Sequence, residues 1–383
     1  MKMSRLSTQI IISIIFIALL PSCDNEVARE STPITVKLGV IGPFSGENKH
    51  WGESGMQGVQ TAVAYHQKRN RGLRVEIIKE DVRSDPTQAE IALAKLAIQD
   101  QVDAVLVLSG SKTTLGIAET ADRYKIPIVS TLASHPGVTN NDWLSQIIFD
   151  DRAQGTVAAL FVMDELLLES ASVIWDGEDP HSTVLAEYFK RTYQEAGGSV
   201  ISIDISARQE DYNKILNQLQ KNKVEFIYLP MEGRHVASFE QSVREIGFKP
   251  QSMVSDGVLS QMMLEYKDNR NLLEGMLATD IYTNEVPLSE FGKSVSIKFK
   301  KLFNTPATTI TALGCEGAHV VLTAIGNCGR DPQNECVNRM IRSGNDFEGI
   351  LDSFFIGLDG KAQRPVYINK IRNQRLRFLL KVN

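Results

Sequence analysis

The chain has 383 residues, of which 43% are hydrophobic and 23% charged, and its formal net charge at pH 7 is -5. This mildly acidic, mixed surface argues against a nucleic-acid-binding protein, which needs a concentrated basic face. The length exceeds that of a usual single core and favours two domains.

The N-terminal segment indicates export. Lys2 and Arg5 precede an apolar run over residues 10–20. That run is too short for a membrane-spanning helix, which needs about 20 apolar residues, but it fits the apolar core of a secretory signal peptide. No later run has the length and composition of a membrane span.

The end of this segment, Leu20-Pro21-Ser22-Cys23, resembles a bacterial lipobox, in which the cysteine is lipidated, although Pro21 departs from the usual pattern. Asp24 resembles an inner-membrane retention signal. We therefore expect a signal peptide over residues 1–22, a lipid anchor at Cys23 and a tether over 23–33. An uncleaved anchor and ordinary signal cleavage nearby are the alternatives.

Strands and helices alternate from residue 34 onwards. Helices are expected at about 54–70, 85–100, 113–124 and 287–323, the second of them capped by Asp85-Pro86. Regular alternation predicts parallel sheets with helices on both faces, and two separate runs predict two α/β lobes. Strands are expected at residues 34–40, 73–80, 102–108, 126–131, 171–175, 200–205, 224–229 and 251–255, and in the tail at 354–358, 366–371 and 376–382.

Two late cysteines flank a loop-rich stretch. Cys328 and Cys336 are separated by Gly-Arg-Asp-Pro-Gln-Asn-Glu. In an oxidising compartment they predict a local disulfide, worth about 2–3 kcal/mol on the chain-entropy model. Two free thiols are the alternative, and zinc is disfavoured because no Cys-x-x-Cys or clustered histidine accompanies them. Cys315, in an apolar stretch, is expected to be buried.

Catalytic motifs are absent from the sequence. It contains no G-x-G-x-x-G, no P-loop and no Gly-x-Ser-x-Gly elbow, and its six histidines are scattered without metal-ligand spacing. We therefore expect no enzyme activity, no cofactor and no metal.

Several segments, in their order and spacing, resemble the branched-chain amino-acid-binding family of periplasmic solute receptors. The resemblance covers residues 34–380 and is carried by the following segments: Val40-Ile41-Gly42-Pro43-Phe44-Ser45-Gly46, Asp85-Pro86-Thr87-Gln88-Ala89, Gly110-Ser111-Lys112-Thr113-Thr114, Ser130-Thr131-Leu132-Ala133-Ser134, Asp346-Phe347-Glu348-Gly349 and Arg364-Pro365-Val366-Tyr367-Ile368.

The family implies a type I periplasmic binding protein fold, with two doubly wound lobes joined by three crossings. One lobe would be 34–150 with 281–349, and the other 151–280 with 350–383. The implied function is capture of an amino acid or related compound for the membrane permease of an ABC importer. The alternative is a receptor subunit of the same fold that signals to a partner.

The resemblance also implies ligand-binding residues. Ser111 and Ser134 match hydroxyls that bind the α-carboxylate, and the Leu132 carbonyl matches an acceptor for the ammonium. Asp256 matches an acid that meets the ammonium from the other lobe, and Trp51 matches an aromatic wall. The simpler interpretations are turn or cap residues for the two serines and Asp256, and a core aromatic for Trp51.

Two aromatic positions of the family are not matched. His181 and Met231-Glu232 stand near them. His181 and Glu232 are therefore added as candidates that could meet a polar or cationic side chain, whereas Lys112 could favour a second carboxylate. Solvated loop residues are the alternative for all three.

Overall fold

The computed structural model describes residues 33–206, 212–283 and 285–383. The expected signal peptide, the lipid-anchor candidate Cys23 and nearly all of the expected tether lie outside the described residues.

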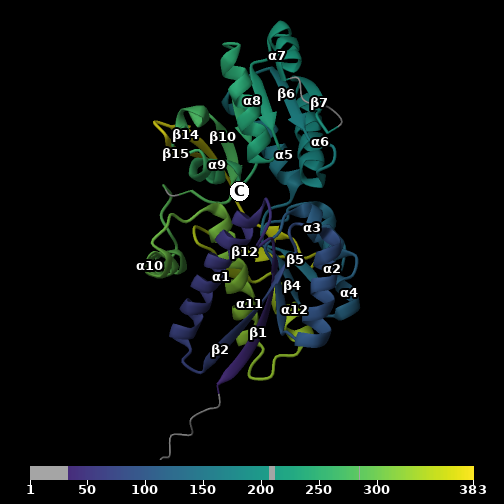
Figure 1. Cartoon of the computed structure of the whole chain (residues 1–383), viewed down its shortest axis with the longest axis vertical. Helices are drawn as coiled ribbons and strands as arrows, with labels where there is room; N and C mark the ends of the chain where they lie inside the picture. The colour runs from purple at the N-terminus through teal and green to yellow at the C-terminus, as the bar shows by residue number, and fades with distance from the viewer. Residues whose placement is uncertain (1–32, 207–211, 284) are drawn as a thin grey trace, which may run out of the picture. The chain divides into compact units, whose positions relative to one another are not determined.

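The first sheet is parallel throughout, in the order β2-β1-β3-β4-β5. Successive strand residues face opposite sides: Leu106 joins the core that includes α1 (Lys49–Arg69) and α11 (Thr309–Asn327), whereas Val105 and Val107 join the core that includes α2 (Pro86–Lys95) and α3 (Ser111–Ala118). Figure 1 shows α1 on one side of this sheet and α2 on the other. The strands are β1 (Ile34–Gly42), β2 (Leu73–Asp81), β3 (Ala104–Val107), β4 (Ile128–Ser130) and β5 (Leu144–Gln146). The sheet is thus covered on both faces.

The helices of this lobe fall into two layers. One layer holds α1 (Lys49–Arg69), α10 (Glu290–Phe303), α11 (Thr309–Asn327) and α12 (Asn334–Ile341). The other holds α2 (Pro86–Lys95), a π-turn (Leu96–Asp100), α3 (Ser111–Ala118), α4 (Ala121–Tyr124) and a 3-10 turn (Pro136–Thr139). The expectation that no later run has the length and composition of a membrane span is wrong for α11, which alone among the described residues has both. Because 89% of that window is buried, α11 resembles the core helix of a globular domain.

Helices α1 and α11 pack closely because glycines stand at their contact. A Cβ on Gly58 would lie 2.1 Å from the carbonyl oxygen of Thr311, and one on Gly314 would lie 2.2 Å from the carbonyl oxygen of Gly55. Any larger residue at Gly58 or Gly314 would push the two helices apart. This contact fixes α11, whose first residues reach the cleft described below.

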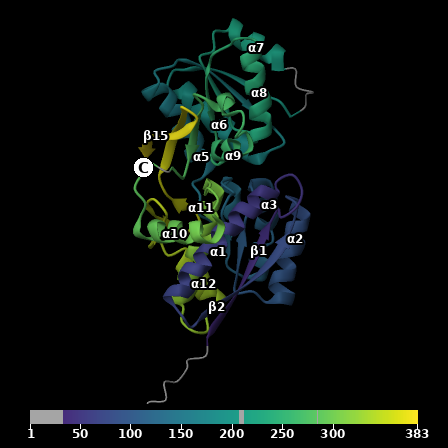
Figure 2. The same cartoon turned by 60° about the vertical axis from the view of Figure 1, so that its left-hand side comes forward.

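The second sheet has the order β15-β14-β10-β9-β8-β6-β7. Its strands β6 to β10 are parallel, and the hairpin β14-β15 adds to β10 antiparallel. Figure 1 labels β10, β14 and β15 beside one another, and Figure 2 shows β15 in yellow in this lobe. The strands are β6 (Ser170–Trp175), β7 (Ser199–Asp204), β8 (Phe226–Leu229), β9 (Gln251–Val254), β10 (Leu277–Asp280), β14 (Val366–Arg372) and β15 (Arg375–Val382).

Helices cover both faces of this sheet as well. One face packs against α5 (Asp151–Leu160), its π-turn (Phe161–Glu165) and α6 (Pro180–Glu195). The other packs against α7 (Tyr212–Lys221), α8 (Gly233–Glu245), α9 (Val258–Glu265) and a 3-10 turn (Arg270–Leu273). The two doubly wound lobes expected from the sequence are therefore confirmed.

The chain passes between the sheets three times: after β5, after β10 and before β14. A small sheet, β11 (Asp346–Glu348), β12 (Ser353–Ile356) and β13 (Ala362–Gln363), precedes the third passage. Phe354, Ile356 and Ala362 belong to the core of the first lobe. The chain therefore stays with the first lobe up to residue 363 and makes its third passage after it. The resemblance places this passage earlier, after residue 349.

Other local features test the sequence analysis. Asp85 caps α2 by accepting a hydrogen bond from the Gln88 backbone N–H at 2.8 Å, and the Cys328–Cys336 disulfide is present, so both predictions are confirmed. The segment expected to be helical over 287–323 is helical for most of its length but holds two helices. Asn304 takes a left-handed conformation that ends α10, and Thr308 caps a new helix, α11.

Further elements depart from expectation. The helix expected over 113–124 is two short helices, α3 and α4, and α3 begins earlier, at Ser111. Strands β5, β10, β11 and β13 were not predicted from the sequence. All four are short and become recognisable only through their pairing with neighbouring strands.

Candidate functional site

A cleft of about 450 Å³ lies where loops from both lobes meet. Its walls come from segments that follow β1, β3 and β4 in the first lobe and β6, β8 and β9 in the second, with the start of α11 between them. Ligand sites in doubly wound folds lie at these carboxyl ends of parallel strands. Of the seven expected ligand residues, six line the cleft: Trp51, Ser111, Leu132, His181, Glu232 and Asp256.

The first-lobe wall offers neutral hydrogen-bonding groups. Helix α3 begins at Ser111 directly after Gly110, and no side chain caps it, so its first N–H groups have no side-chain acceptor. Such a helix start attracts a carboxylate. Ser111 is 5% exposed, and its hydroxyl accepts a hydrogen bond from the His135 backbone N–H at 3.2 Å. The Leu132 carbonyl accepts no hydrogen bond from any described residue.

Trp51 forms an aromatic part of the same wall. It lies in the first turn of α1 and packs against the backbone of Gly110, where a Cβ would come within 3.1 Å of the indole ring. This close approach holds the ring beside the start of α3. The arrangement fits an apolar wall for a ligand side chain.

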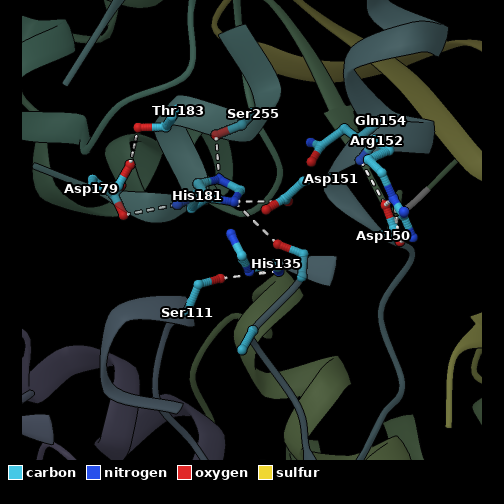
Figure 3. A network of polar contacts seen from close by, with 12 residues as sticks. Ser111, His135, Asp150, Asp151, Arg152, Gln154, Asp179, His181, Thr183 and Ser255 are labelled. Carbon is cyan, nitrogen blue, oxygen red and sulfur yellow. Dashed lines mark hydrogen bonds and ion pairs between the residues drawn. The ribbon is translucent and has the colours of Figure 1, made fainter. Parts of the chain in front are cut away.

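The second-lobe wall is built around His181, in the first turn of α6. Its Nδ1 lies 2.9 Å from Asp151 Oδ1 and 3.1 Å from Ser134 Oγ, and its Nε2 lies 3.3 Å from Ser255 Oγ (Figure 3). Asp151 is completely buried, at the start of α5. The imidazole is therefore held on both nitrogens by residues from three separate segments.

The charge of His181 follows from these neighbours. Burial alone lowers the pKa of its imidazole, but Asp151, through charge and hydrogen bond, followed by Asp256 and Asp179, raises the pKa to about 10. His181 is therefore an imidazolium at neutral pH, and Asp151 is its counterion.

Asp256 follows β9 and faces the cleft. Its Oδ1 is buried and has no hydrogen-bond partner among the described residues. Burial raises the pKa of this carboxyl and Asp151 raises it further, whereas His181 and a hydrogen bond from Gln154 lower it. A buried acceptor without a donor is costly, so a cationic donor from a ligand would be stabilised here.

Ser134 is placed differently from the other expected residues. It is 1% exposed and is not among the residues that line the cleft. Its hydroxyl contacts His181, and its carbonyl accepts the Asp151 backbone N–H at 2.9 Å. The structure therefore places Ser134 behind the wall, where it orients His181.

A salt bridge joins the two lobes at the edge of the cleft. Arg234, at the start of α8, contacts Glu47 of the first lobe and lies 3.0 Å from Glu232 Oε2. Burial raises the pKa of Glu232, and Asp179 and Asp176 raise it further, whereas Lys112 lowers it. Glu232 therefore forms an ion pair with Arg234 and lies near the acidic residues Asp176 and Asp179.

Sequence reasoning missed the groups behind the second wall. Asp151, Gln154 and Asp280 are buried, and Asp280 accepts hydrogen bonds from the backbone N–H of Ile281 at 2.7 Å and the Thr309 hydroxyl at 2.8 Å. Burial raises the pKa of Asp280 to about 7. The pair Asp150-Asp151 was visible in the sequence, but nothing there indicated that only Asp151 meets a histidine. The described residues contain no group of three potential metal ligands.

Comparison with known proteins places this architecture in a family. A model described as periplasmic binding protein matches residues 35–375. An amino acid binding protein of Pseudomonas aeruginosa is 24% identical over 270 residues, which cover 69% of this chain and 71% of that protein. The Leu/Ile/Val-binding protein homolog 6 of Brucella melitensis is 24% identical over 301 residues, covering 76% of this chain and 75% of that protein.

Solved structures share the fold. A leucine binding protein from Thermotoga maritima has a TM-score of 0.83 at 25% identity, covering 91% of this chain and 99% of its own. A solute binding protein of an ABC transporter from Rhodopseudomonas palustris, in complex with 3,4-dihydroxybenzoic acid, has a TM-score of 0.79 at 16% identity, covering 91% and 97%. These proteins are named for binding, not for catalysis. The chain therefore belongs to the periplasmic binding protein family, and the resemblance to its branched-chain amino-acid-binding members is confirmed.

Proposed function

We propose that this chain is an extracytoplasmic receptor that captures an amino acid, or a closely related compound, and delivers it to an ABC importer. The carrying observation is the chemistry of the opposed walls. The uncapped start of α3 with Ser111 lines the cleft from one lobe, and Asp256, whose Oδ1 is buried without a hydrogen-bond partner among the described residues, lines it from the other. An α-carboxylate and an α-ammonium need these two partners.

Lobe closure provides the mechanism. Ligand binds first through Ser111, the N–H groups of α3 and the Leu132 carbonyl, while Trp51 packs on its side chain. Asp256 then meets the ammonium from the second lobe. Closure is favoured only by contacts that the ligand makes with both walls. The moving bodies are residues 34–150 with 281–363, and 151–280 with 364–383, joined by three crossings.

We propose further that Cys23 is lipidated after removal of residues 1–22 and anchors the receptor to the inner membrane. The lipobox-like sequence supports this, and Asp24 supports retention there. Metabolic labelling with a fatty acid, compared between the natural chain and Cys23→Ala, tests it. Equal labelling of the two proteins would exclude the anchor.

Calorimetric titration with a panel of amino acids, amides and carboxylates tests the binding function. A ligand at 100 times its dissociation constant should also stabilise the fold by about 2.7 kcal/mol. Binding of one amino-acid class is the expected result. A folded protein that binds none of the panel would overturn the amino-acid assignment.

The transport role needs a separate test. Uptake of the identified ligand by cells that lack this receptor should fall and should return when the receptor is restored. Uptake that does not change would favour the signalling receptor instead.

A further inference from the structure

Carboxylates outnumber cationic side chains in the lining of the cleft. Seven acidic residues line it, against Lys112, Arg234 and the imidazolium of His181. His50 also lines it, but burial lowers the pKa of its imidazole, which leaves it uncharged at neutral pH. The surplus of negative charge gives the cleft a potential that favours cations.

Most of the cations are already engaged. Arg234 pairs with Glu47 and Glu232, and His181 pairs with Asp151 behind the wall. Lys112 is exposed and stands on the first-lobe wall. The acids of the second wall therefore keep most of their charge uncompensated.

Asp176 and Asp179 are two acids of the second wall that have no ion-pair partner among the described residues. Both are half-buried in the loop between β6 and α6, and both line the cleft. Their Oδ1 atoms accept only backbone N–H groups, from Glu178 at 2.9 Å and from His181 at 3.1 Å. Within the described ranges no lysine, arginine or histidine side chain lies within 4.0 Å of either carboxylate.

These two acids also lie close to Glu232. After burial, they are the main causes of the raised pKa of that residue, which places three carboxylates in one electrostatic neighbourhood. Like charges in one site disfavour one another's ionised forms. A cation among them would relieve this repulsion and gain charge-assisted hydrogen bonds.

A second observation identifies the rest of the ligand. Asp256 lines the same cleft, and its buried Oδ1 has no hydrogen-bond donor among the described residues. We propose that the ligand is a basic amino acid, an inference that rests on the proposed function. Its α-carboxylate and α-ammonium meet Ser111 and Asp256, and its side-chain cation meets Asp176 and Asp179.

The test is calorimetric titration of the full chain with lysine, arginine, leucine, glutamate and cadaverine, a diamine without a carboxylate. Lysine or arginine should bind at least tenfold more tightly than leucine or glutamate, a difference of about 1.4 kcal/mol. The double variant Asp176→Asn, Asp179→Asn should lose at least tenfold in affinity for the basic ligand. Asparagine keeps the cap of α6, so folding is preserved.

The matched control is Glu187→Gln, which removes an exposed acid of α6 that does not line the cleft and should leave the affinity within about twofold. Tighter binding of leucine or glutamate than of lysine and arginine would overturn the cationic specificity while leaving the amino-acid receptor intact. Cadaverine binding as tightly as lysine would overturn the amino-acid assignment itself. Failure of all five compounds to bind the folded chain would overturn both proposals.

Discussion

The two walls of the cleft differ although the same kind of element builds them. Each consists of loops and helix starts at the carboxyl ends of parallel strands. The first wall presents a hydroxyl, backbone groups and an indole. The second presents carboxylates and an imidazolium that already has its counterion. The fold therefore sets where the groups stand, and the residues chosen for each loop set the charge.

We propose that this difference gives an amino-acid ligand its orientation. On this proposal, a carboxylate would be stabilised at the start of α3 and repelled by the acids opposite, whereas an ammonium would be stabilised beside Asp256. A ligand bound in the reverse orientation would place its ammonium at the start of α3 and its carboxylate beside Asp256, where each charge would be repelled. The following predictions test the comparison, beginning with the largest expected effect.

Asp151→Asn should damage the second wall most. It removes the counterion of a buried imidazolium, and breaking such a pair costs about 3 kcal/mol in the free energy of unfolding. The pKa of His181 should fall from about 10. Urea unfolding and an NMR titration of His181 measure the two effects. Asp164→Asn, at an exposed acid on the adjoining turn, should change neither.

The same pair predicts a pH dependence. Because the folded pKa of His181, about 10, exceeds its unfolded value, its stabilisation is complete below about pH 6.5 and is lost as the pH rises towards 10. The difference in stability between the natural chain and Asp151→Asn should therefore shrink over this range. A difference that stays constant from pH 6 to pH 10 would show that His181 is not charged.

Asp256→Asn should weaken ligand binding at least tenfold, about 1.4 kcal/mol or more, because the ammonium loses a buried charged partner. The substitution keeps the shape of the side chain, so the melting temperature without ligand should not fall. Calorimetry measures the affinity, with the exposed Asp268→Asn as the control. Unchanged affinity would remove Asp256 from the site.

Ser111→Ala should weaken binding less, by about two- to tenfold. One neutral hydrogen bond is lost, worth about 0.5–1.5 kcal/mol, while the N–H groups of α3 remain. If Ser111→Ala lost more affinity than Asp256→Asn, the first wall would contribute more to binding than the charged second wall, which would contradict the comparison. Circular dichroism should confirm that α3 still forms.

Lys112→Gln should have the smallest effect, within about threefold in affinity, because the lysine is exposed and its charge is screened. The change should be smaller still at high salt. If binding fell more than tenfold, Lys112 would be a direct carboxylate partner, and a ligand with a second carboxylate would become the better proposal.

Local sequence was sufficient for most of the fold. The alternation of apolar strands with helices was sufficient to predict the two lobes, because the spacing of apolar residues along a segment reflects which of its faces is buried. Asp85 before Pro86 determined the start of α2, and the short spacing of Cys328 and Cys336 allowed their disulfide.

Tertiary structure decided the details of the site. His181 and Asp151 are 30 residues apart, and only the packing of α5 against α6 brings them to 2.9 Å. The same packing turns Ser134 towards His181 and away from the cleft, although its place in the sequence suggested a ligand contact. Such pairings depend on the distances between helices and strands. Those distances are set by close packing in the core, as at the contact between α1 and α11. A local sequence pattern does not encode this packing.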